Sequence, residues 1–64
     1  MNPSDMVFDA VYKGALKRGA VDRHANDQAV IAVEDYRKNK FKKVSHLIEE
    51  KTNMAVKLSK GEGK

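Results

Sequence analysis

The residues that could support acid–base or metal chemistry are few in this chain and widely spaced. His24 and Asp27 stand three residues apart, which puts both on one face of a helix, with Asp22 close by. The second histidine, His46, lies far along the chain. The absence of cysteine excludes disulfides and thiolate metal sites. We favour surface or boundary positions for both histidines over a metal site that they would share with Asp22 or Asp27.

Neighbouring carboxylates and glycines form no recognisable catalytic motif either. The acidic pairs at 34–35 and 49–50 are adjacent in sequence, so on a helix each pair points in two directions. Gly14 and Gly19 lack the spacing of a phosphate-binding loop. General acid–base catalysis needs a positioned group in a pocket, and a chain of 64 residues has little room for one. We therefore predict a protein that is not an enzyme and uses no metal or cofactor.

The strongest chemical signal is a basic stretch at residues 36–43. It holds five cations and two aromatic residues, without any acid. Such a stretch can bind phosphates with release of counterions, and Tyr36 or Phe41 could stack on an unpaired base. For the two rings we favour a simpler interpretation, in which they anchor the ends of two helices in the core. The residues predicted to bind nucleic acid are Arg37, Lys38, Lys40, Lys42 and Lys43, helped by Lys57 and Lys60.

Charge is distributed unevenly along the chain. The net charge is +4, yet residues 1–32 hold four basic and four acidic groups, whereas residues 33–64 hold nine basic and five acidic groups. Lysine outnumbers arginine ten to three. Because lysine acts as a point charge and arginine supplies the planar fork that reads bases, we expect phosphate contacts of modest specificity. A basic half can also attract an acidic protein.

Apolar periodicity predicts the helices that position these residues. The first spans about 3–18, with Asn2 as its N-cap and Gly19 just beyond its C-terminal end. Gly14 either weakens this helix or marks a close crossing with another one. The second helix starts after Asp22, or in a shorter version is capped by Asn26, and runs to about Lys38. Asn39 can adopt the left-handed conformation that ends it.

The third segment, 40–60, is either one helix or two helices broken near Thr52 and Asn53. Lys51 interrupts its apolar seam. A helix-turn-helix with its turn at Asn53 is not favoured, because Glu49 stands where that motif needs a small packing residue.

These elements predict an all-α fold, a small antiparallel three-helix bundle with the second helix at its centre. Residues 1–60 form the domain and 61–64 a flexible tail. The third-helix seam holds more apolar surface than one short helix can cover, so we expect a homo-oligomer such as a dimer. The predicted partner-binding residues are Phe41, Val44, Leu47, Ile48, Met54 and Leu58.

Two functions fit this fold. The first is a small regulator associated with nucleic acid through phosphate contacts. The alternative is a protein-interaction factor, an inhibitor or adaptor that uses apolar helix faces against a larger protein. A membrane role is not expected, because the longest apolar run, 29–33, is far short of the roughly 20 residues that span a bilayer. We expect a soluble, cytoplasmic protein.

Overall fold

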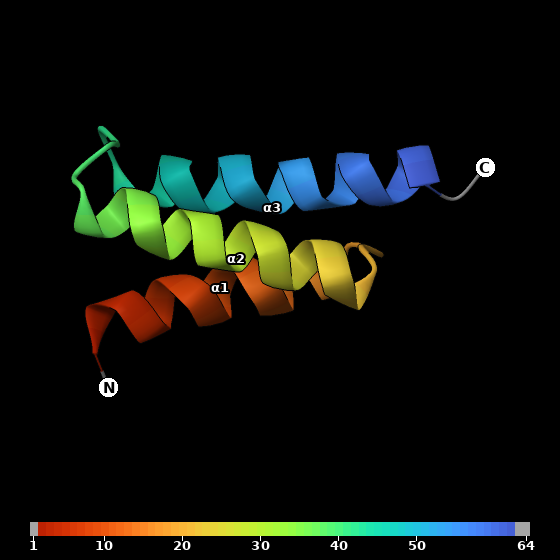
Figure 1. Cartoon of the computed structure of the whole chain (residues 1–64), viewed down its shortest axis with the longest axis horizontal. Coiled ribbons are helices and arrows are strands. Elements are labelled where there is room, and N and C mark those ends of the chain that lie inside the picture. The colour runs from red at the N-terminus through yellow and green to blue at the C-terminus, as the bar shows by residue number, and fades with distance from the viewer. Residues whose placement is uncertain (1, 63–64) are drawn as a thin grey trace.

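Three helices arranged side by side make up the computed structural model, which describes residues 2–62. They are α1 (Pro3–Lys17), α2 (Asp22–Arg37) and α3 (Val44–Glu62), and the described residues form no strand. Each helix contacts the other two, and α2 runs antiparallel to both α1 and α3 (Figure 1). This confirms the predicted all-α three-helix bundle. The starts of α1 and α3, the end of α2 and the α2–α3 connection therefore lie together, at what we call the loop end.

Both predicted caps of α1 are present. The Asn2 side chain accepts a hydrogen bond from the Ser4 backbone N–H at 2.8 Å, which satisfies a donor at the helix start. At the other end Gly19 has a φ of +98°, a conformation that side-chain-bearing residues rarely adopt. The backbone N–H of Ala20 then donates to the Ala15 carbonyl at 2.9 Å, as in a Schellman motif.

The end of α2 explains why α3 starts later than predicted. Asn39 has a φ of +57°, and the Lys40 N–H donates to the Asp35 carbonyl at 2.9 Å, so a second Schellman motif turns the chain out of the helix. Residues 40–43 are not helical, and α3 begins at Val44 instead of Lys40. Phe41 consequently belongs to the connection and not to the third-helix seam.

From Val44 onward α3 is one continuous helix, so neither a break near residues 52–53 nor a turn at Asn53 exists. Instead, Asn53 accepts a hydrogen bond from the Arg18 guanidinium at 2.5 Å, which ties α3 to the end of α1. The helix extends to Glu62, into the predicted tail, because Gly61 lowers helix propensity without stopping the helix. The rest of that tail, 63–64, lies outside the described residues.

The start of α2 depends on α3. The helix begins at Asp22 itself and not after it, with Val21 as an N-cap that makes no side-chain hydrogen bond. The shorter version capped by Asn26 is wrong. The Val21 N–H donates to the Ser59 hydroxyl oxygen at 2.9 Å, and that hydroxyl donates to the Ala55 carbonyl at 2.8 Å. The hydroxyl of a serine 38 residues away therefore accepts the hydrogen bond of the backbone N–H at this turn.

The core has two parts that differ in side-chain size. Toward the loop end Val7 and Val11 pack on alanines of α2, with Tyr36 and Ile48 against them. The other part is made of four alanines, at positions 15, 20, 25 and 55. Small side chains let helices approach closely, and a Cβ added at Gly14 would lie 3.6 Å from the Thr52 methyl group. Gly14 therefore does lie where α1 and α3 meet, although with room for a methyl group.

A hydrogen bond between Tyr12 of α1 and Asp22 of α2 makes the stability of the fold vary with pH in the alkaline range. The Tyr12 hydroxyl donates to the Asp22 carboxylate, and this bond, with smaller effects of desolvation and of the Asp22 charge, raises the pKa of Tyr12. Because the pKa is higher in the folded state, the stabilisation is complete below the ordinary tyrosine value of about 10 and is lost as pH rises through the folded value.

We therefore expect Tyr12→Phe to be less stable than the parent near neutral pH, with a difference that shrinks above about pH 10. Urea unfolding of both proteins across this range measures it. A stability difference that stays constant with pH would show that the hydrogen bond does not carry it.

Candidate functional site

The five cations of residues 36–43 gather at the loop end, and all of them are exposed. Arg37 ends α2, and the others follow it in the α2–α3 connection. Two other lysines form ion pairs within the bundle, Lys13 with Asp9 at 3.3 Å and Lys51 with Asp35 at 3.4 Å. We call this set the loop cations. It consists of Arg37, Lys38, Lys40, Lys42 and Lys43.

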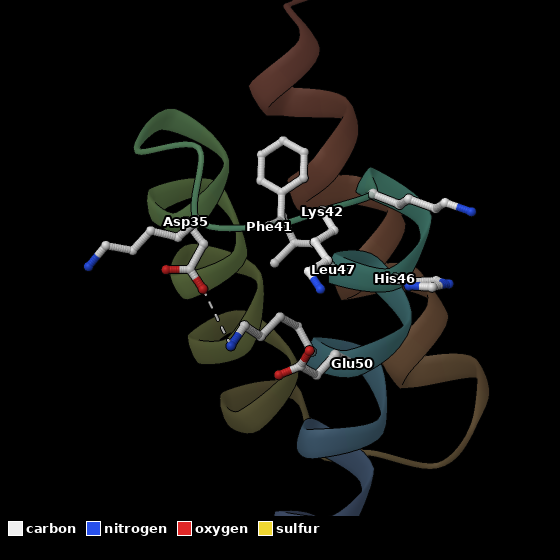
Figure 2. A pocket seen from close by; sticks show the side chains of 9 residues that line it. Asp35, Phe41, Lys42, His46, Leu47 and Glu50 are labelled. Carbon is white, nitrogen blue, oxygen red and sulfur yellow. Dashed lines mark ion pairs between the residues drawn. The ribbon is translucent and has the colours of Figure 1, made fainter.

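A hollow of about 200 Å³ lies under the connection, between α2 and α3. Three of the loop cations line it, together with Lys51, His46 and the acids Asp35 and Glu50. Figure 2 shows the Lys51–Asp35 ion pair crossing between the two helices, and Lys42 and His46 extending away from it. Lys51 of the predicted seam is therefore a mostly buried link to α2, which explains a charged residue at that position.

Lys57 and Lys60 are not part of this site. They lie on the far half of α3, and with a rise of about 1.5 Å per residue Lys57 is roughly 20 Å along the helix from Val44. The structure thus separates the seven cations predicted to bind nucleic acid into five at the loop end and two near the opposite end. Sequence proximity grouped the five, whereas helix length separates the other two from them.

The two aromatic residues of the basic stretch stack on each other. The ring centroids of Tyr36 and Phe41 are 5.5 Å apart with an angle of 11° between the planes. Tyr36 also packs against the valine–alanine core. Tyr36 thus anchors the end of α2 in the core, as the favoured interpretation has it. Phe41, in contrast, lies in the connection and not at the start of α3, and it stacks on Tyr36. One face of each ring is thereby covered.

The predicted partner-binding residues differ widely in exposure. Leu47 is only 4% exposed and belongs to the core, and Ile48 packs against the core from α3. Phe41 is half-buried beside Tyr36. Those left on the surface are Val44, Met54 and Leu58. With Leu47 buried, less of the predicted apolar seam is left on the surface than the sequence suggested.

An apolar groove between α1 and α3 was missed by the sequence analysis, apart from two of its residues. It measures about 280 Å³ and opens at the loop end. A stripe on α1 with the helical spacing 3, 6, 7 and 10 could have indicated it, because this stripe borders the face that enters the core. We call it the α1–α3 groove. Its lining residues are Pro3, Met6, Val7, Ala10, Tyr36, Val44 and Ile48.

The two histidines lie at opposite ends of the bundle. His24 is half-buried in the first turn of α2, and His46 is exposed in the first turn of α3. Over residues 2–62, no group of three or more histidine or acidic side chains is placed to hold a metal ion. In the same residues, no helix combines the length and apolar character needed to cross a bilayer.

Comparisons with known proteins identify no relative. No family model matches the chain, and no match to it was found among curated proteins or solved structures.

Proposed function

We propose that the protein is a non-enzymatic regulator associated with nucleic acid, and that the loop cations hold its phosphates. The observation that carries this proposal is the gathering of five exposed cations at one end of the bundle. Lysines that neutralise phosphates release the counterions condensed on the nucleic acid, which makes binding favourable at low salt. The starts of α1 and α3 lie at the same end and add the positive ends of two helix dipoles.

The chemistry of these cations predicts weak sequence preference. Four of the five are lysines, which contact phosphates as point charges. Contacts to phosphates position a protein on a nucleic acid but carry no sequence information. We therefore expect similar affinity for unrelated sequences, in keeping with a cytoplasmic accessory protein.

Salt dependence tests the proposal. If all five loop cations contact phosphates, log affinity for duplex DNA falls with log salt with a slope of about −4 to −5. The double variant Lys42→Gln/Lys43→Gln should lose about tenfold in affinity at low salt, and its slope should be shallower by about 2. Fluorescence anisotropy with labelled duplex and single-stranded DNA, at about 50 and 200 mM salt, measures both quantities.

The chain offers a matched control for net charge. Lys57→Gln/Lys60→Gln also removes two positive charges, but from the far half of α3. Its affinity for DNA and its salt-dependence slope should therefore stay near those of the parent. Equal losses in the two double variants would mean that net charge alone attracts nucleic acid. An absence of binding by the parent protein at low salt would eliminate the proposed function.

A second function, the binding of a larger protein as an adaptor or inhibitor, is supported by the α1–α3 groove. The groove and the loop cations lie at the same end of the bundle.

A further inference from the structure

We infer that the α1–α3 groove docks an acidic amphipathic helix of another protein. The groove follows two turns of α1, from Pro3 to Ala10, which is about 10 Å at 1.5 Å per residue. A helix laid into such a groove contacts it with apolar side chains at positions i, i+3, i+4 and i+7. The length of the groove therefore suits a partner helix of two to three turns. Docking of such a helix does not depend on nucleic-acid binding.

The side chains at the rim can adapt to a partner. Met6 is 58% exposed, more than any other large apolar residue among those described, and Val44 faces it from α3 with 37% exposed. Methionine is unbranched and polarisable, so it fits side chains of different shapes. Val7 is buried beneath them in the core, which gives the groove a fixed floor.

Charge around the groove selects an acidic occupant. Val44 directly follows Lys42 and Lys43, and Tyr36, at the α2 side of the groove, directly precedes Arg37. The positive ends of the α1 and α3 dipoles lie at the same end. Asp5 in the first turn of α1 opposes this charge with one carboxylate. Two other acids next to groove residues are neutralised by lysines, since Asp9 pairs with Lys13 and Asp35 with Lys51. A partner with glutamates or aspartates on both sides of its apolar stripe meets this field favourably.

The same charges argue against a second copy of the chain in the groove. A symmetric pairing uses the same patch on both subunits, so it would bring two sets of loop cations together. Like charges placed across an interface oppose association unless they are neutralised. An acidic amphipathic helix covers the groove with apolar side chains, and its carboxylates neutralise the loop cations instead of repelling them.

Two variants of exposed apolar residues on α1 provide the test. The probe is a synthetic peptide with leucine at i, i+3, i+4 and i+7 and glutamate on the remaining surface, compared with a scrambled peptide of identical composition. Met6→Gln changes the groove, whereas Leu16→Gln places the same amide on α1 outside the groove, at a residue 39% exposed. Both side chains lie on the surface, so both variants should remain folded.

We expect the amphipathic peptide to bind at least about tenfold more tightly than the scrambled one, as NMR titration of the backbone amides would show. Met6→Gln should weaken binding about tenfold, and Leu16→Gln should leave it unchanged. Equal binding of the two peptides, or no binding of either, would overturn the inference. So would a parent dimer that Met6→Gln converts to a monomer, because a second copy would then fill the groove. DNA binding by the loop cations should not respond to Met6→Gln, which separates this result from the proposed function.

Discussion

Replacing Leu47 by alanine is expected to lower the free energy of unfolding by about 2–4 kcal/mol. Leu47 is 4% exposed, and it lies in the first turns of α3, where the helix packs against the end of α2. The substitution removes three buried carbons and leaves a cavity that three short helices can only partly close. Domains of this size have only a few kcal/mol of net stability, so much of the protein should unfold at moderate urea.

Leu58 is the matched control for this prediction. It has the same side chain on the same helix, but it is 40% exposed. Leu58→Ala should therefore cost less than about 1 kcal/mol, since exposed substitutions usually change stability little. Urea unfolding followed by circular dichroism measures both variants. If the two substitutions lower the free energy of unfolding equally, Leu47 is not a core residue, and a role in binding a partner is again open to it.

Replacing Asn39 by valine is expected to cost about 2 kcal/mol, because a β-branched residue in the left-handed region is a strong outlier. Asn39 has a φ of +57° and turns the chain from α2 into the connection that bears four of the loop cations. Its N–H donates to the Tyr36 carbonyl at 3.2 Å. The strain therefore acts on the geometry that presents the cations as well as on the end of α2.

Asn39→Gly separates backbone conformation from the loss of the asparagine side chain. Glycine adopts positive φ without steric cost, so this variant should be about as stable as the parent. Thermal unfolding of both variants, with DNA binding at low salt beside it, tests the prediction. Equal destabilisation by valine and glycine would assign the effect to the amide side chain.

Local sequence signals predicted the helices well because their causes are local. Asn2, Gly19 and Asn39 each act within a few residues of their own positions, through a side-chain cap or a left-handed backbone. The start of α3 was predicted too early because residues 40–43 have no helix-breaking residue. What removes them from the helix is the second Schellman motif together with the stack of Phe41 on Tyr36.

The candidate site was predicted in part. The loop cations are contiguous in sequence, so any fold brings them close together. The contribution of Lys57 and Lys60 depended on the path of α3, and a continuous helix carries them away from the loop end. The groove residues come from all three helices. The sequence analysis named Val44 and Ile48 but not the stripe at positions 3, 6, 7 and 10, although its helical spacing is readable in the sequence.

The sequence by itself determined that the chain is helical, where α1 and α2 end, and that a basic connection joins two of the helices. These properties arise from periodicity, caps and contiguous charge, which act over one or two turns. Tertiary structure alone decided which seam residues are buried, that Ser59 receives the Val21 N–H, and that α1 and α3 leave an apolar groove. Each of these depends on distances between helices, which are set when the side chains of all three pack together.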